Sequence, residues 1–197
     1  PFDPFEVNFN YTEANAWQYS LYVPQDISGL MDLMGGKKKL ENHLDAMFSA
    51  QLETSGRDQP DITGLIGQYA HGNEPSHHMA YLYNYVGKAS KTQKYVSKIL
   101  QEQYSKKPDG LSGNEDCGQM SAWYVLSSTG IYPIRPGSSK YASGSCQFDS
   151  VIYHVNQYSN TFTINNKRRQ SKENIPVCGF IDHSEIIKGG AYAFKDY

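Results

Sequence analysis

The chain has 197 residues, of which 39% are hydrophobic and 19% charged, with a formal net charge of −2. This is an ordinary composition for a soluble domain, and without an excess of basic residues we expect no nucleic-acid partner. No apolar run approaches the roughly 20 residues that a membrane span needs. The chain shows no signal peptide and begins at Pro1 rather than Met, which is typical of a mature or excised segment.

The unusual feature of the composition is its aromatic content, at 13% with 16 Tyr. Tyr and Trp rings can stack on the C–H faces of sugars while their polar tips form hydrogen bonds, although a Tyr-rich core would look the same. Cysteines are few and far apart, and no CxxC motif indicates zinc or redox chemistry. They are Cys117, Cys146 and Cys178.

Most of the first 137 residues show the apolar spacing that predicts helices joined by polar loops. Repeated helix–loop–helix units predict stacked antiparallel helices whose connecting loops line one face. The predicted helices cover residues 12–19, 26–34, 37–51, 75–86, 90–104 and 117–128, with N-caps at Thr12, Asp26 and Ser90.

Pro133 and Pro136 mark a boundary near residue 137, beyond which apolar and polar residues alternate as they do in strands. We expect residues 138–197 to form an antiparallel β module, which makes the fold class α+β. The strands are predicted at residues 148–155, 161–164, 175–181 and 191–194.

One polar segment, residues 71 to 78, runs directly into an apolar helical stretch. Polar groups that converge at the start of a helix can bind a ligand or a metal, although a plain surface loop is the alternative. The oxygens of Asn73 and Glu74 suit a hard cation such as calcium. The imidazoles would suit zinc, but no HExxH motif accompanies them. The histidines are His71, His77 and His78.

Two further segments offer carboxylates. Glu13 lies four residues before Trp17, so on a helix both would share one face, and an indole beside a carboxyl raises the pKa of that carboxyl. A general acid needs such a group, although Glu13 could also be a surface residue. Glycines flank Asn114, Glu115 and Asp116. These three residues supply more hydrogen-bond acceptors than the start of a helix requires. A protonated and an ionised carboxyl group facing each other are what glycoside hydrolysis requires.

Three stretches carry a family resemblance: TEANAWQY, GQYAHGNEPSHHMAYLYNYVG and GLSGNEDCGQMSAWYVLSSTGIYP. In this order they resemble glycoside hydrolase family 92, the calcium-dependent exo-α-mannosidases, and the resemblance covers essentially the whole chain. It implies that residues 1–137 are the C-terminal portion of an (α/α)6 catalytic barrel and that residues 138–197 are a small antiparallel β-sandwich module. It also implies hydrolysis of terminal α-mannosides with inversion.

The resemblance also implies roles for individual residues. Glu13 is similar to the family's general acid and Asp116 to its general base. Asn73 and Glu74 fall in the calcium-binding loop, where the ion binds mannose hydroxyls and helps to distort the ring. The residues expected in or near the subsite for the cleaved mannose are Trp17, His71, His77, His78 and Glu115.

Two positions depart from the family pattern. Many members carry Asp where this chain has Asn114, so a carboxylate that could tune the base is an amide here. Members specific for α-1,2 linkages tend to carry Glu where this chain has Gly72, which argues against strict α-1,2 preference.

Length is the larger departure, because the family's barrel has about twelve helices and this chain shows roughly six. We therefore expect the C-terminal part of a longer enzyme, with mannose-containing glycans and the N-terminal part of the same enzyme as partners. Export to the periplasm, cell surface or medium is expected from the family alone. An inactive glycan-binding or structural fragment is the competing hypothesis, and a zinc hydrolase is a third.

Overall fold

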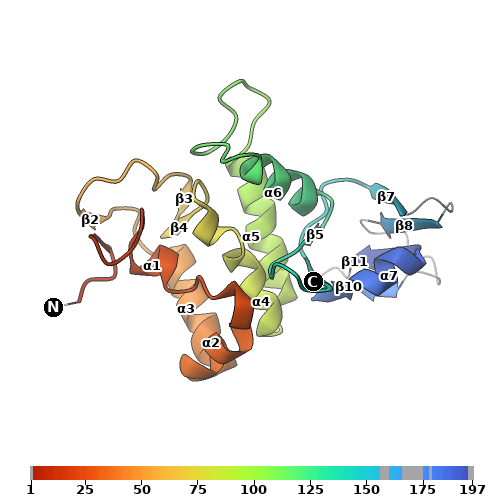
Figure 1. The fold of residues 1–197 in the computed structure, drawn as a ribbon, viewed down its shortest axis with the longest axis horizontal. Helices are drawn as coiled ribbons and strands as arrows, with labels where there is room; N and C mark the ends of the chain where they lie inside the picture. Colours follow the sequence, from red (N-terminus) through yellow and green to blue (C-terminus); the bar gives the residue numbers. More distant parts are fainter. Residues whose placement is uncertain (1, 156–159, 166–174, 178, 195–197) are drawn as a thin grey trace.

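The computed structural model describes residues 2–155, 160–165, 175–177 and 179–194, and it combines a helical part with small β-sheets (Figure 1). The mixed α and β content confirms that level of the fold prediction. The helices are α1 (Ala16–Tyr19), α2 (Ile27–Leu33), α3 (Lys37–Ser49), α4 (Leu82–Tyr85), α5 (Ala89–Glu102), α6 (Gln119–Ser128) and α7 (His183–Lys188), with 3-10 turns η1 (Pro24–Asp26), η2 (Glu74–Ser76) and η3 (Met79–Tyr81).

Helices α2 and α3 form as their sequences predict. The Asp26 carboxylate accepts a hydrogen bond from the Gly29 backbone N–H at 2.9 Å, which satisfies one of the free donors at the start of α2. The apolar stripe of α3 is buried, with Leu44 and Met47 completely inaccessible to solvent. Both stretches combine a clear start with a 3.6-residue apolar period, so local and tertiary preferences agree.

Two of the predicted caps are wrong. Helix α1 is capped by Asn15 rather than Thr12, because Asn15 and Gln18 exchange backbone and side-chain hydrogen bonds in a capping box. The Asn15 amide also donates to Gln68 Oε1 at 2.8 Å, which anchors the start of the helix to a distant segment. Helix α5 begins at Ala89 with Lys88 as its N-cap and no side-chain bond, so Ser90 lies inside the first turn.

The helix predicted over residues 75–86 is broken into η2, η3 and α4. The breaks fall at His77 and His78, which are buried. Both imidazoles bond to backbone carbonyls of other segments, at His71 and Leu21 respectively. These tertiary bonds, absent from any local propensity, favour short turns over one regular helix.

Over the described residues the strands form four small sheets, and the largest of these is mixed rather than antiparallel. Strands β7 and β8 pair antiparallel as expected, but β11 lies parallel to both β8 and β9. The chain reaches β11 through α7, which was not predicted, and a strand that follows a helix is free to enter in the parallel direction. The strands are β1 (Glu6–Val7), β2 (Ser55–Gly56), β3 (Leu65–Ile66), β4 (Tyr69–Ala70), β5 (Ile131–Tyr132), β6 (Lys140–Ser143), β7 (Ser150–Val155), β8 (Asn160–Asn165), β9 (Ile175–Val177), β10 (Phe180–Asp182) and β11 (Gly190–Phe194).

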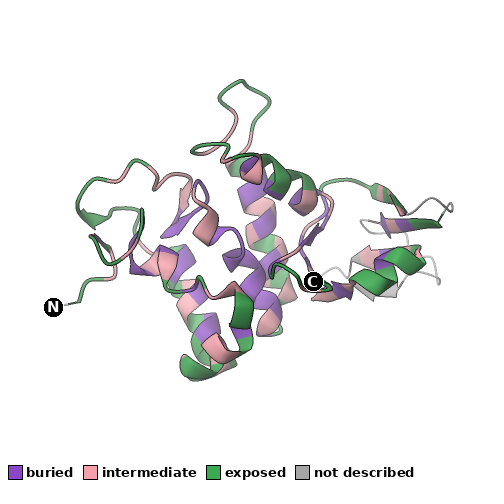
Figure 2. Cartoon of the chain, viewed as in Figure 1, coloured by how far each residue is buried: buried purple, intermediate pink, exposed green. Residues whose placement is uncertain are grey.

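Two hydrophobic clusters stabilise the molecule. The larger one gathers where α3, α4 and α5 meet, and it includes Leu44, Tyr83 and Ile99 (Figure 2). The smaller one lies under the mixed sheet around Phe162 and Ile164. Strands β5 and β6, which pair with each other on either side of residue 137, contribute to both clusters. The domain boundary at that residue stays a prediction.

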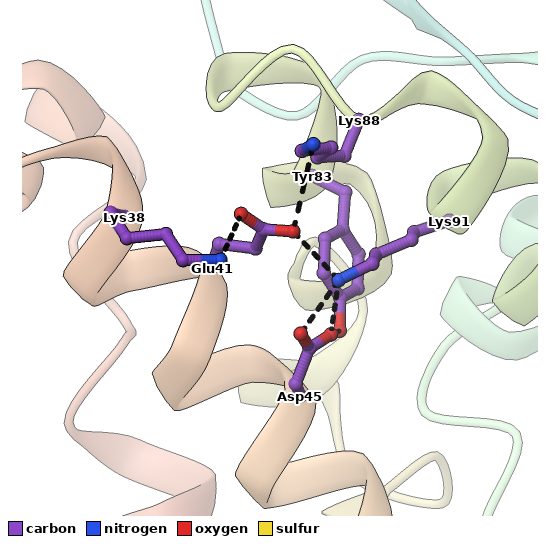
Figure 3. A network of polar contacts seen from close by, with 6 residues as sticks. All are labelled: Lys38, Glu41, Asp45, Tyr83, Lys88 and Lys91. Carbon is purple, nitrogen blue, oxygen red and sulfur yellow. Dashed lines mark hydrogen bonds and ion pairs between the residues drawn. The ribbon is translucent and has the colours of Figure 1, made fainter.

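A network of charges links the helices beside the larger cluster (Figure 3). The Lys91 ammonium on α5 lies 2.8 Å from a Glu41 oxygen and 2.6 Å from an Asp45 oxygen, both on α3. The Tyr83 hydroxyl on α4 donates to the same Asp45 carboxylate at 2.8 Å.

Among the described residues, no helix is long and apolar enough to cross a membrane.

Candidate active site

Backbone strain marks two of the predicted catalytic residues. Among the described residues, three that are not glycine have a positive φ: Glu13 at 55°, Asp116 at 51° and Cys117 at 54°. This left-handed region is disfavoured for residues with a Cβ. Such residues cost about 1–3 kcal/mol each and cluster at functional sites. The two residues expected to perform the chemistry are therefore held in a backbone conformation of unfavourable free energy, as is common at functional sites.

Both carboxylate-bearing segments meet the dipeptide Asn73-Glu74. The Asn73 amide donates to the Glu13 backbone carbonyl at 3.4 Å. On the other side, partial burial raises the pKa of Asp116, and the negative charges of Glu74 and Asp61 raise it further. Three loops that are distant in sequence thus come together, as expected if they line one face of the helical part.

Glycines permit this close approach of the loops. A Cβ atom at Gly72 would lie 1.8 Å from the Thr63 hydroxyl oxygen. At Gly113, where φ is +73°, it would lie 2.7 Å from the Gly72 carbonyl oxygen. A side chain at Gly113 would push the acidic loop away from the histidine-containing loop, and one at Gly72 would push that loop away from the segment of Thr63.

His71 lies behind the site rather than in it. Its side chain is completely buried, and its ring nitrogens bond to the hydroxyls of Tyr69 at 2.8 Å and Tyr104 at 2.7 Å. The His71 ring packs on His77 with ring centroids 5.0 Å apart. Burial lowers the pKa of His71 well below its usual range, so the ring is neutral at pH 7.

The geometry fixes the tautomer of His77. Its Nε2 lies 3.0 Å from the His71 carbonyl oxygen, and since a carbonyl only accepts, Nε2 carries the proton. Nδ1 then accepts from the Gln119 amide at 3.0 Å. Burial lowers the pKa of His77 to about 4. The ring of His78 is likewise held, by the Leu21 carbonyl oxygen at 2.8 Å, and burial lowers its pKa too.

A pocket of about 570 Å³ opens beside these residues, within the usual range for small-molecule sites. Four of the residues predicted from the sequence line it: Glu74, His77, His78 and Asp116. The loops therefore bring together the carboxylates of Glu74 and Asp116 and the neutral imidazoles of His77 and His78 at one hollow, whereas Glu13 is not among its lining residues.

Two other predicted residues have partners elsewhere. Helix α1 begins at Ala16, so Glu13 lies outside it and the helical spacing that would place Trp17 over Glu13 does not apply. The Trp17 ring instead packs on the His43 ring, with ring centroids 5.0 Å apart, and it lines a separate hollow. The Glu115 carboxylate accepts hydrogen bonds from the backbone and hydroxyl of Ser121 on α6.

Several residues of the pocket were not singled out from the sequence. Gln119 and Trp123 both hold His77, the first through its ring and the second through an indole bond of 3.0 Å to its carbonyl oxygen. Their spacing of one helical turn is a signal that could have paired them. Tyr22 and Tyr132 also line the pocket, and nothing local in the sequence separates them from the other tyrosines.

The donors near Asn73 and Glu74 are of the kind that calcium prefers. Amide and carboxylate oxygens are hard ligands, whereas the neighbouring imidazoles are engaged in hydrogen bonds. Within the described ranges, however, no three His, Cys, Asp or Glu side chains gather in a way that could hold a metal ion. The chemistry of these donors therefore fits calcium, but their number falls short of the six to eight oxygens of a full shell.

Comparison with known proteins decides the family. The sequence model of the family described as the glycosyl hydrolase family 92 catalytic domain matches residues 1–195 of this chain. The chain belongs to glycosyl hydrolase family 92. Among solved structures of the family, the α-mannosidase BT3965 from Bacteroides thetaiotaomicron in complex with mannoimidazole is 34% identical, with a TM-score of 0.82. The inverting mannosidase BT2199 from the same organism is 31% identical, with a TM-score of 0.76.

The chain spans only part of these family 92 proteins. Each of the two structural matches covers 98% of this chain but only 28% of the solved protein. A secreted glycosidase of Arthroderma benhamiae, whose activity is uncharacterized, is 27% identical over 166 residues, which are 84% of this chain and 19% of that protein. These three proteins are therefore about three to five times longer than this chain.

Proposed function

We propose that the chain is part of the catalytic region of an exported, calcium-dependent α-mannosidase that removes terminal α-linked mannose from glycans with inversion. One observation carries the proposal: the segments of Glu13 and Asp116, two residues in strained left-handed backbone, both approach Asn73-Glu74, the first through the Glu13 backbone carbonyl. The similarity to the α-mannosidases BT3965 and BT2199 supports the substrate class, and the latter supports inversion. Similarity to a secreted glycosidase supports export.

Glu13 acts as the general acid in this proposal. It gives its proton to the glycosidic oxygen as the bond from that oxygen to the anomeric carbon breaks. Asp116 is the general base: it takes a proton from the water that attacks the anomeric carbon on the opposite face. The raised pKa of Asp116 makes it a stronger base than an ordinary aspartate. Solvent then returns the proton from Asp116 to Glu13.

Other residues bind and orient the sugar. His77 and His78 face the pocket as neutral rings of fixed orientation, and His71 positions His77 from behind. Glu115 and Trp17 stay candidates for substrate contacts. Asn73 and Glu74 would hold calcium, which when bound supplies ligand sites for mannose hydroxyls. The remaining donors, the rest of the (α/α)6 barrel and further substrate contacts would come from the remainder of a family-length polypeptide.

The test is hydrolysis of an aryl α-mannoside by a family-length polypeptide that contains this chain, after chelation and after calcium is restored. We expect activity only with calcium, a first-formed product of inverted anomeric configuration by proton NMR, and a loss of about 10²–10⁴-fold in Glu13→Gln and in Asp116→Asn. Glu102→Gln and Asp109→Asn, which change exposed carboxylates elsewhere, serve as controls.

Near-normal rates in either site variant would remove that residue from the mechanism. Calcium-dependent binding of mannose without turnover would favour the glycan-binding fragment instead, a possibility motivated by the 28% coverage of the relatives. Zinc retained through purification, with activity lost to a zinc-selective chelator, would revive the zinc hydrolase.

A further inference from the structure

Tyr22 is an exposed aromatic residue at the pocket. Its side chain is 46% exposed although the residue lines the hollow that holds Asp116. The ring packs on that of His78 in a T-shaped arrangement with ring centroids 5.8 Å apart, and Pro24 begins the turn η1 two residues on. Within the part of the chain that the structure describes, its hydroxyl makes no hydrogen bond, so it is available to a ligand.

The pocket lining divides into two groups that meet at the paired histidines. The acidic group consists of Glu74 and Asp116, and it lies beside His77. His77 is close enough that a positive charge on its ring would lower the pKa of Asp116. Tyr22 lies beside His78 instead. The predicted base Asp116 and the aromatic ring of Tyr22 thus lie in different parts of one hollow.

The surroundings of Tyr22 are apolar and rigid. Pro24, Ile134 and Pro136 line the pocket with it, and the Tyr132 hydroxyl, held by the Gln119 amide at 3.3 Å, adds a polar point. An aromatic ring flanked by apolar carbons and isolated hydroxyls matches a sugar ring, with its C–H faces and its peripheral hydroxyls. A small aryl or methyl group would leave most of this surface unused.

We infer that Tyr22 is a specificity-determining residue whose ring stacks on the sugar that leaves when terminal mannose is cleaved, so that the preferred substrates are di- or oligosaccharides. This inference rests on the proposed function for the identity of the reaction. It assigns to Tyr22 the binding of the leaving group and no part in proton transfer.

Calorimetric titration of a family-length polypeptide that contains this chain, in calcium-containing buffer, tests the inference. The ligands are methyl α-mannoside and a thio-linked α-mannobiose, which resists hydrolysis. We expect the disaccharide to bind about tenfold more tightly than the methyl glycoside, which corresponds to roughly 1.4 kcal/mol. Tyr22→Ala should lose most of that advantage, while its affinity for methyl α-mannoside should stay within about twofold. Tyr22→Phe should keep the advantage, because the ring is retained.

The matched control is Tyr124→Ala, which removes another exposed tyrosine that lines a different hollow, and it should change neither affinity. An unchanged preference in Tyr22→Ala, no preference in the unmodified chain, or no binding of either ligand would overturn the inference. Preferential binding by the unmodified chain without release of mannose from an oxygen-linked mannobiose would overturn the proposed function and leave the role of Tyr22 standing.

Discussion

At the scale of single residues, the tightest packing near the site is between Gly72 and Thr63. A Cβ at position 72 would lie 1.8 Å from the Thr63 hydroxyl oxygen, so we expect Gly72→Ala to lower the free energy of unfolding by about 1–3 kcal/mol. That hydroxyl is buried without a hydrogen-bond partner among the described residues, so Thr63→Ala should be nearly neutral. Urea denaturation of both variants and of the double variant measures the effect. If the double variant is no more stable than Gly72→Ala, the cost does not come from this contact.

Single residues also show where sequence reasoning ends. Glu13 and Asp116 could be singled out from the sequence because their motifs are local. Their left-handed backbone could not, since nothing in the residue type requires it. Gln119 was missed for a related reason, because its partner His77 comes from a loop far away in the chain. The spacing of Gln119 and Trp123 by one helical turn pairs these two residues, but it does not identify His77 as their common partner, because that contact joins distant segments.

At the scale of elements, the charge network between α3 and α5 makes stability depend on acid. Hydrogen bonds from Lys91, and then Lys38, lower the pKa of Glu41 from 4.5 to about 2. A carboxyl group with a lowered folded pKa contributes stability above its unfolded pKa, and that stability is lost as the pH falls through the folded pKa. We therefore expect stability from this pair to fade between about pH 4.5 and pH 2.

Lys91→Ala should be less stable than the unmodified chain at pH 7 and should approach it as the pH falls through this window. Urea midpoints from pH 7 to pH 2 measure the gap. Lys98→Ala is the matched control, because the ion pair that Lys98 makes with Glu102 is long, at 3.9 Å, and solvent-exposed, so little change is expected at any pH. A gap for Lys91→Ala that stays constant across the range would assign its cost to packing rather than to charge.

Elements differ in how far the sequence determines them. Helices α2 and α3 follow from their apolar period, and α2 also from its cap at Asp26, and both could be predicted. The parallel placement of β11 could not, because alternation of apolar residues defines which face is buried and not the direction of the neighbouring strand. The turns of η2 and η3 were likewise decided by tertiary bonds of the buried histidines.

At the scale of the whole molecule, three buried histidines couple folding to pH in a second window that begins at a higher pH. Burial lowers the folded pKa of His71, His77 and His78 below the ordinary value of 6.5. Between the folded and the unfolded pKa the unfolded chain binds more protons, so stability must rise with pH and must be lost as the pH falls below about 6.5. For His77, with a pKa of about 4, the loss is on the order of 3 kcal/mol.

His77→Gln removes this titrating group, and we expect the stability of the variant to depend less steeply on pH between 6.5 and 4. The free energy of unfolding at several pH values in that range measures the slope. His154→Gln, an exposed histidine on β7, should keep the original slope. Equal slopes in His77→Gln and the unmodified chain would mean that His77 titrates alike in both states. Because the His77 window closes near pH 4 and the Glu41 window opens near pH 4.5 and runs down to about pH 2, one pH series separates most of the effect of His77 from that of the charge network that joins the helices.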